Sequence, residues 1–329
     1  MPLSENPTLL EVKDLRKYFP LRSGPFSGTR ETLRAVDGVS FSLRKGETLG
    51  VVGESGCGKS TAGRAILRLI EPTSGHVFLE GVDFCSLNPK ELRESRKKAQ
   101  IIFQDPFNSL NPKQTIKRIV REPLDNYQVG KAKDREGMVI QLLTRVGLQP
   151  MHVSRHPKDF SGGQRQRIVI ARALALRPKL IIGDEPVSAL DVSIQAQVLN
   201  LLKDLQEEFG LSYVFISHDL GVIRHMSDRT AVMYLGRFVE LAPSEALYQN
   251  PLHPYSKALL SAIPDPLSKA AKKRIVLEGD VPSPIHPPSG CTFHPRCPVF
   301  QKEKNPVCTR EQPELREISL SRLAACHAL

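Results

Sequence analysis

Residues 53–61 have the composition of a phosphate-binding loop. The stretch Gly53-Glu54-Ser55-Gly56-Cys57-Gly58-Lys59-Ser60 fits the pattern G-x-x-x-x-G-K-[ST], and Thr61 follows it. Glycines let the backbone wrap around a phosphate, and the amides at a helix N-terminus point at the anion. Lys59 would reach the β- and γ-phosphates of ATP, and the Ser60 hydroxyl would ligate Mg²⁺. Cys57 occupies a variable position of the pattern, so no redox role is assigned to it.

Two acidic residues close a second apolar stretch. The segment KLIIGDEP at 179–186 predicts a buried strand that ends in Asp184 and Glu185. Ligands of parallel sheets bind at the carboxyl ends of the strands, so both carboxylates are placed for chemistry. Asp184 would hold the magnesium, usually through water. Glu185 would orient and deprotonate the water that attacks the γ-phosphate.

The residues Phe160-Ser161-Gly162-Gly163-Gln164 introduce a predicted helix, RQRIVIARALAL. A serine and two glycines at a helix N-terminus form a second potential anion site. Here the sequence resembles the ABC ATPase family, whose signature is LSGGQ, and the resemblance covers roughly residues 8–265. Phe160 replaces the usual leucine, which affects packing and leaves the phosphate-binding residues intact. In that family this loop completes the ATP pocket of the opposite subunit.

The resemblance assigns further residues in chain order. Gln104 follows the apolar run IIF as the family's Q-loop glutamine does, and it would sense the magnesium and the water. The segment SALD, which ends at Asp191, resembles the D-loop that crosses the dimer interface. His218 follows YVFIS and resembles the switch histidine that contacts the γ-phosphate. Phe19 is the candidate for stacking on adenine, with Tyr18 as the second choice.

Elements that alternate between strands and helices must position these residues. Strands are predicted at 8–13, 35–43 and 47–52, at the IIF run, and at 179–186 and 211–219. Helices are predicted from Lys59 to about residue 70 and over 193–209, where Gly210 would end the helix. This alternation predicts an α/β fold with a largely parallel sheet. Residues 105–160 contain Pro106, Pro112 and Pro123 and then a helical pattern, and they predict a helical insertion.

These elements and the resemblance together imply a P-loop NTPase fold of the ABC cassette type. Its RecA-like core would carry an N-terminal antiparallel β-subdomain and the inserted helical subdomain at 105–160. The nucleotide-binding domain would span residues 1–265. After Pro264 the chain becomes rich in proline, so residues 266–329 are expected to form a small, irregular extension that contains cysteines.

Composition restricts where such a protein can act. The chain has 329 residues and a net charge of +11, with the charge spread along its length. A solvated surface explains this charge better than nucleic-acid binding does, and a nearby anionic membrane is the second choice. No stretch approaches the roughly 18–20 apolar residues of a membrane-spanning helix, and the N-terminus does not resemble a secretory signal. We therefore expect a cytoplasmic protein that serves a membrane only through partners.

Four of the six cysteines lie in the last 39 residues: Cys291, Cys297, Cys308 and Cys326. Stable disulfides are unexpected in a reducing cytoplasm. A short, proline-rich tail with few large apolar residues gains stability from a metal site, and four thiolates suit either [4Fe–4S] or tetrahedral zinc. Free thiols are the third alternative, and His294 and His327 are substitute ligands. Members of the resembled family that have a similar tail carry a [4Fe–4S] cluster, so the resemblance favours the cluster.

The branch of the family is indicated by several stretches that resemble the dipeptide, oligopeptide and nickel importers. NPLHPYSKALLSAIP and PSPIHPPSGCTFHPRCP lie outside the catalytic core and discriminate most strongly. The resemblance implies the second ATPase subunit of a pair, at the cytoplasmic face of the cell membrane. Its partners would be a homologous ATPase, two transmembrane permease subunits and an extracytoplasmic peptide-binding protein, with no nucleic acid.

Three alternatives to peptide import remain open at this stage. The first is an importer for another cargo, such as nickel, glutathione, an opine or a sugar. The second is an ABC ATPase that does not transport, but the short 105–160 insertion lacks heptads and the chain has one cassette. The third is a kinase or GTPase with a P-loop, and the SGGQ motif argues against it.

Overall fold

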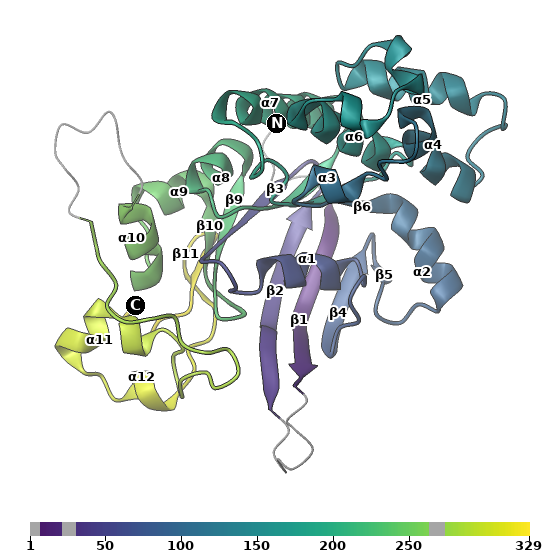
Figure 1. Ribbon diagram of the computed structural model, residues 1–329. Helices are drawn as coiled ribbons and strands as arrows, with labels where there is room; N and C mark the ends of the chain where they lie inside the picture. The colour runs from purple at the N-terminus through teal and green to yellow at the C-terminus, as the bar shows by residue number, and fades with distance from the viewer. Residues whose placement is uncertain (1–6, 22–30, 263–273) are drawn as a thin grey trace. The chain divides into compact units, whose positions relative to one another are not determined.

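The structure is a computed structural model that describes residues 7–21, 31–262 and 274–329 (Figure 1). The chain divides into two compact units. The first comprises residues 44–47 and 87–215 together with the described start of the chain at Pro7. The second comprises the described parts of 8–43, 48–86 and 216–329. Each unit is described by itself.

An antiparallel sheet forms one layer of the second unit (Figure 1). Its strands lie in the order β2-β1-β4-β5, with bounds β2 (Thr32–Arg44), β1 (Thr8–Pro20), β4 (Ser74–Leu79) and β5 (Val82–Asp83). Strand β1 pairs with β4 in the register Leu10↔Leu79, and this register shifts after Lys13. Asp14 has a φ of 45° at this bulge. A one-residue bulge exchanges the faces that the following side chains occupy.

A second set of strands in this unit includes the strand that leads into the P-loop. The order is β11-β12-β10-β9-β3, with bounds β11 (Arg316–Ser319), β12 (Arg322–Ala324), β10 (Arg237–Pro243), β9 (Arg229–Tyr234) and β3 (Thr48–Val52). Strands β3 and β9 are parallel, with Val51 opposite Ala231. The pairs β9–β10 and β10–β12 are antiparallel.

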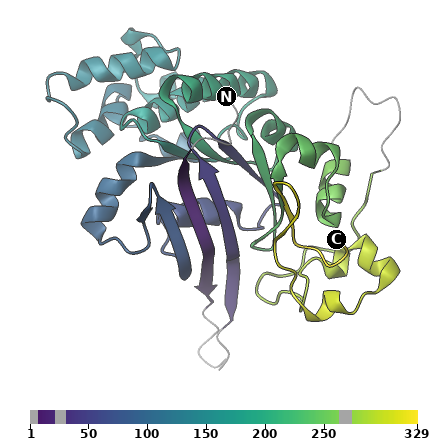
Figure 2. The ribbon, with the colours of Figure 1, turned by 180° about the vertical axis from the view of Figure 1, so that it is seen from behind.

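Six helices complete the described part of the second unit: α1 (Lys59–Ile66), α8 (Leu220–Met226), α9 (Ser244–Gln249), α10 (Pro254–Ser261), α11 (Pro298–Glu303) and α12 (Val307–Arg310). The tail differs from the irregular extension that the sequence predicts, because it contains α11, α12 and two strands. Glu240 of β10 pairs with Ala324 of β12, so the tail extends the sheet (Figure 2). Elements of three to six residues are too short to show a period in the sequence.

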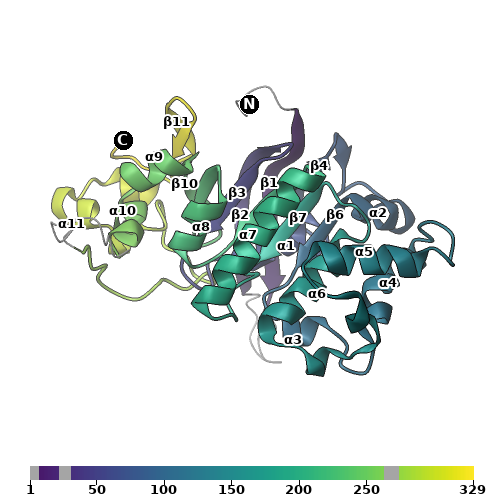
Figure 3. The same cartoon turned by 90° about the horizontal axis from the view of Figure 1, so that it is seen from above.

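The first unit combines three strands with a group of helices. The strands are β6 (Ala99–Ile102), β7 (Leu180–Asp184) and β8 (Ser212–Ile216), and the helices are α2 (Pro89–Ser95), α3 (Pro106–Ser109), α4 (Ile116–Asn126), α5 (Arg135–Arg145), α6 (Gly162–Leu174) and α7 (Val192–Phe209). Strands β6 and β7 are parallel. Helices α3, α4 and α5 pack against α6 (Figure 3). Between residues 105 and 160 every described element is helical.

Most of the predicted core elements are present, with small changes at their ends. Strand β1 runs to Pro20, well beyond the predicted end at residue 13, and α1 ends at Ile66 rather than near residue 70. Helix α7 ends at Gly210, which has a φ of 63°, as the sequence predicts. Among the described residues, no helix combines the length and apolar character that crossing a membrane requires.

Candidate functional site

At two positions, the P-loop backbone adopts a geometry that only glycine permits. Gly58 has a φ of 105°, and a Cβ at this residue would lie 2.0 Å from the carbonyl oxygen of Ala35. A Cβ at Gly53 would lie 2.2 Å from the carbonyl oxygen of Met233. Real Cβ atoms do not approach a carbonyl oxygen this closely. The loop can therefore form its tight turn only because residues 53 and 58 are glycines.

The lysine of the loop lies within the turn that the loop forms. Lys59 is 5% exposed, and its Nζ donates to the carbonyl oxygens of Gly53 at 2.8 Å and Glu54 at 2.9 Å. Its helix, α1, has no side-chain cap at its N-terminus. The first backbone amides of such a helix lack intrahelical partners and attract anions. The geometry therefore fits a phosphate between these amides and the ammonium group.

Cys57 lies beside this lysine and is buried. Burial raises the pKa of its thiol, although the charge of Lys59 opposes the shift. The thiol therefore stays protonated at neutral pH.

Residues outside the sequence motif also hold the loop. The amide of Gly236 donates to the carbonyl oxygen of Cys57 at 2.9 Å, and the amide of Glu54 donates to the Tyr255 hydroxyl at 3.0 Å. The Glu54 carboxylate forms an ion pair with Arg296. Sequence reasoning missed Tyr255 and Arg296, because no local pattern links them to a loop more than 200 positions earlier in the chain.

The first unit brings together two residues that the sequence places 81 positions apart. The side-chain amide of Gln104 donates to the Glu185 carboxylate at 2.9 Å. Asp184 is 1% exposed at the end of β7. Glu185 has a φ of 51°, in the left-handed region that non-glycine residues rarely adopt. Such strain concentrates at functional sites, and here it turns the chain sharply after the strand.

The signature loop begins α6 with reciprocal caps. The Ser161 hydroxyl accepts from the Gln164 amide at 3.4 Å, and the Gln164 side chain accepts from the Ser161 amide at 3.0 Å. A Cβ at Gly163 would lie 2.4 Å from the Ile194 side chain, so the loop packs closely on α7. Asp191, the last residue of the predicted D-loop, is the N-cap residue of α7. The two predicted segments are thus neighbours within this unit.

His218 belongs to the second unit and follows β8 directly. It is exposed, and it precedes Asp219, whose carboxylate accepts from the amides of Gly221 and Val222 and thereby caps α8. The histidine therefore lies in a short turn between a buried strand and a capped helix. This placement exposes its ring for contact with a ligand.

The two aromatic candidates for adenine stacking lie on opposite faces of β1. Tyr18 shares a face with Arg16, and its hydroxyl donates to the Asp37 carboxylate. Phe19 shares the other face with Lys17, whose Nζ lies 4.8 Å from the centre of the ring. Because side chains alternate along a strand, this second face is also that of Leu15, which is fully buried.

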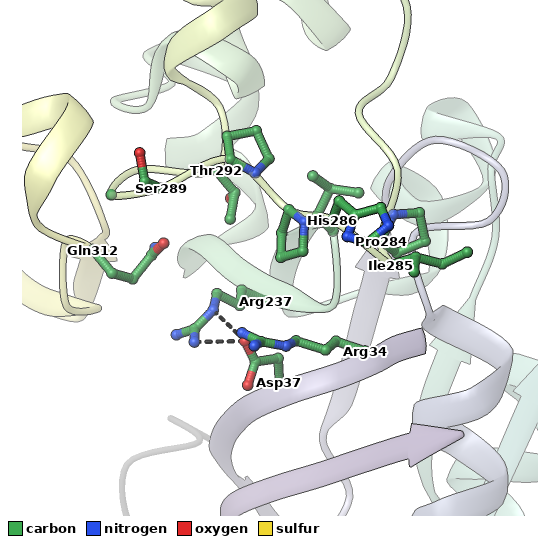
Figure 4. Close-up of a pocket in the computed structure, with 13 residues that line it drawn as sticks. Arg34, Asp37, Arg237, Pro284, Ile285, His286, Ser289, Thr292 and Gln312 are labelled. Atoms are coloured by element: carbon green, nitrogen blue, oxygen red, sulfur yellow. Dashed lines mark hydrogen bonds and ion pairs between the residues drawn. The ribbon is translucent and has the colours of Figure 1, made fainter. Parts of the chain in front are cut away.

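Asp37, the residue that accepts from Tyr18, lines a polar pocket together with Arg34 and Arg237 (Figure 4). Asp37 at this pocket accepts two hydrogen bonds from Arg237, at 3.0 and 2.6 Å. Burial raises the pKa of Asp37, but hydrogen bonding from Tyr18 and the charge of Arg237 outweigh it, so the net shift is downward. Tyr18 therefore belongs to a network of charged residues, whereas the apolar Phe19 ring has no hydrogen-bonding group.

The four tail cysteines line a single, mostly apolar cavity together with His294 and His327. Burial, with a smaller contribution from the neighbouring thiols Cys326, Cys308 and Cys297, raises the pKa of Cys291 to about 11. Within the three described ranges, no group of three or more His, Cys, Asp or Glu residues is placed to hold one metal ion.

Comparisons with known proteins agree with these features. Residues 36–188 match the family "ABC transporter", and residues 239–303 match "Oligopeptide/dipeptide transporter, C-terminal region". The chain is 55% identical to the oligopeptide transport ATP-binding protein AppF of Bacillus subtilis, over 99% of both chains. It is 53% identical to the oligopeptide transport ATP-binding protein OppF of Salmonella typhimurium, over 95% of this chain and 94% of the relative.

A solved structure also matches. It is a dimeric ATP-binding cassette in a post-hydrolysis state bound to ADP and Pi, and the TM-score is 0.63 at 30% identity. The match covers 72% of this chain and 99% of that one.

Proposed function

This chain belongs to the ABC transporter ATPase family, and we propose that it hydrolyses ATP to energise the import of di- or oligopeptides. The main support for a peptide cargo is the match of residues 239–303 to the C-terminal region of oligopeptide and dipeptide transporters. The names of AppF and OppF, which the chain matches over nearly their full lengths, support the same cargo.

The proposed chemistry is the attack of water on the γ-phosphate of ATP. The Lys59 ammonium and the loop amides neutralise charge on the phosphates, and Ser60 and Asp184 are the proposed residues that hold Mg²⁺. Glu185 is the proposed general base. Its hydrogen bond to Gln104 supports a role for that glutamine in orienting the carboxylate and its water. His218 would contact the γ-phosphate, and Phe19 would stack on adenine.

The remaining nucleotide contacts are proposed to come from a partner ATPase. Ser161, Gly162, Gly163 and Gln164 would contact the nucleotide held by that partner, and Asp191 would lie at the interface. The dimeric state of the structural relative supports this arrangement. The partner would be a homologous subunit, and the pair would bind two permease subunits at the cytoplasmic face of the membrane. Residues 105–115 would contact the permeases, and an extracytoplasmic binding protein would deliver the peptide.

We also propose a division of the chain by function. Residues 1–265 would be the nucleotide-binding domain, with 105–160 as its helical insertion, and 266–329 would be the peptide-transporter extension. The boundary at 265 itself lies outside the described residues. The helical character of residues 106–159 supports the proposed insertion.

Uptake of labelled peptides by the source cells tests the cargo. Deletion of the gene should abolish uptake of one peptide class, and the wild-type gene should restore it while Glu185→Gln should not. Uptake of nickel, glutathione and an opine is measured in the same strains. Normal peptide uptake in the deletion strain, with loss of one of the other cargoes, would reject peptide import and leave the ATPase intact.

We propose that the tail thiols hold a [4Fe–4S] cluster with a structural role. Four cysteines around one apolar cavity fit such a group, because each iron takes one thiolate and an apolar shell limits access of water. The raised pKa of Cys291 means that ligation must displace a proton. Cys291, Cys297, Cys308 and Cys326 are the proposed ligands.

Anaerobic purification followed by iron and sulfide analysis and an absorption spectrum tests this proposal. We expect about four irons and four sulfides per chain. A colourless protein with one zinc, or one with four freely alkylated tail thiols and no metal, would reject it.

A further inference from the structure

A partly buried ion pair joins the tail to the P-loop. The two terminal nitrogens of Arg296 approach the two carboxylate oxygens of Glu54 at 2.9 and 3.3 Å. The arginine side chain is 9% exposed and that of Glu54 is 28% exposed. A two-point contact between a guanidinium and a carboxylate fixes both orientation and distance, which a single contact does not.

Aromatic packing holds this arginine in place. Phe293, three residues earlier, is 1% exposed, and its ring centre lies 5.2 Å from that of Tyr234 and 5.3 Å from that of Tyr255. Tyr255 is the residue whose hydroxyl accepts from the Glu54 amide. The tail therefore fixes both the backbone and the side chain of Glu54, through Tyr255 and Arg296 respectively.

The same short segment lies between two of the tail cysteines. The 3₁₀ turn η5 (His294–Arg296) follows Cys291, and Cys297 comes directly after Arg296. The amide of Cys297 donates to the carbonyl oxygen of His294 at 3.2 Å, so the cysteine and the arginine share one rigid turn. A displacement of Cys297 must therefore move Arg296 as well.

We propose that Arg296 is a positioning residue for nucleotide binding, which holds the P-loop through Glu54 and couples nucleotide affinity to the thiol-lined cavity. The inference rests on the P-loop as the nucleotide site, but it depends neither on the peptide cargo nor on which group the thiols hold. Glu54 lies in the loop that would surround the phosphates, and an unpaired carboxylate there repels them. Arg296 neutralises that carboxylate and keeps the loop in its phosphate-binding shape.

Nucleotide affinity of four folded proteins tests the positioning role. We titrate a non-hydrolysable ATP analogue with Mg²⁺ into the wild type, Arg296→Gln, Glu54→Gln/Arg296→Gln and Arg310→Gln, and we confirm folding by thermal unfolding. Arg296→Gln should bind roughly 10- to 100-fold more weakly, the loss expected for a hydrogen-bonded charge pair. The double variant should recover part of the lost affinity, because the unpaired carboxylate is gone while the contact that holds the loop is still missing. Arg310, exposed on the same tail, is the matched control and should bind normally.

Two results in this titration would overturn the inference. One is a folded Arg296→Gln protein that binds as tightly as the wild type. The other is a loss of affinity that the added Glu54→Gln change does not relieve. Failure of the wild type to bind any nucleotide would instead reject the proposed ATPase site, so the two failures are distinguishable.

The coupling has a second readout that does not use activity. Because coupling between sites is reciprocal, bound nucleotide should hold the turn that carries Cys297 more firmly, and it should slow alkylation of this thiol in the wild type. The rate is followed by mass spectrometry with and without the ATP analogue. In Arg296→Gln the nucleotide, added at saturating concentration, should leave the rate unchanged. A wild-type rate that is independent of nucleotide would overturn the coupling.

Discussion

The P-loop and the signature loop are both glycine-containing turns that start a helix. They differ in whether side chains of the same loop cap the first amides of that helix. Helix α1 has no side-chain cap, Lys59 bonds the carbonyl oxygen of Gly53, and Arg296 of the tail pairs with Glu54. Helix α6 is capped by the Ser161 and Gln164 side chains, and Ser161 is exposed. The P-loop is thus prepared for phosphate within one chain. The side chains of the signature loop cap its own helix, and the ligand proposed for this loop would have to come with a partner.

The largest expected effect separates chemistry from binding. Glu185→Gln should reduce hydrolysis by at least ~100-fold, a typical loss for a positioned general base. Binding of ATP should persist, because the P-loop is unchanged. Lys59→Ala should instead weaken nucleotide binding itself. Phosphate release and equilibrium binding measured on both variants check the distinction, and near-normal turnover of Glu185→Gln would remove this residue from the mechanism.

The next prediction breaks the P-loop through its backbone. Gly58→Ala adds a Cβ at a φ of 105° and 2.0 Å from the Ala35 carbonyl oxygen. Strain of about 1–3 kcal/mol should lower nucleotide affinity by roughly 10- to 100-fold, if the loop must distort to relieve it. Gly56→Ala is the matched control, because its φ is 79° but no atom lies within 4 Å of the added Cβ. Equal affinities for the two variants would contradict this account.

A smaller change in nucleotide affinity is expected from variants of Phe19 and Tyr18, which lie on opposite faces of β1. Phe19→Ala should weaken nucleotide binding by roughly 5- to 50-fold, as loss of an aromatic platform for a base does. Tyr18→Phe should leave the affinity unchanged, since its hydroxyl bonds Asp37 on the other face. It should lower the free energy of unfolding by about 1 kcal/mol. Isothermal titration and urea unfolding measure both quantities, and a normal affinity in Phe19→Ala would remove Phe19 as the stacking residue.

The smallest effect concerns the signature loop in the isolated chain. Ser161→Ala should lower the free energy of unfolding by about 1 kcal/mol through loss of the helix cap, and it should not change nucleotide affinity. When the partner subunits are added, its hydrolysis should fall well below that of Gln164→Ala. The control breaks the other half of the same cap but keeps the hydroxyl. Reduced nucleotide affinity in the isolated chain would show that Ser161 acts on its own subunit's nucleotide.

Much of the candidate site could be predicted from the sequence, because its motifs are local. The P-loop glycines, the acids after β7 and the start of α6 each depend on backbone and side chains within about ten residues. Strands β9, β10 and β12 were not predicted, although β9 lies directly beside β3. Their pairing is a long-range event, and short apolar runs alone do not distinguish strand from helix.

The sequence by itself determined the family, the motif residues and the cluster of tail cysteines, since each is encoded by residue types at fixed spacing. Only the tertiary structure decided which side of β1 each aromatic occupies, because a bulge at Asp14 exchanges the two faces. It alone brought Gln104 to Glu185, and Arg296 of the tail to Glu54 of the P-loop. Such contacts join residues 81 and 242 positions apart, and a charge pair at that separation leaves no periodic signal in the chain. The packing of Phe293 among two tyrosines fixes where the arginine lies.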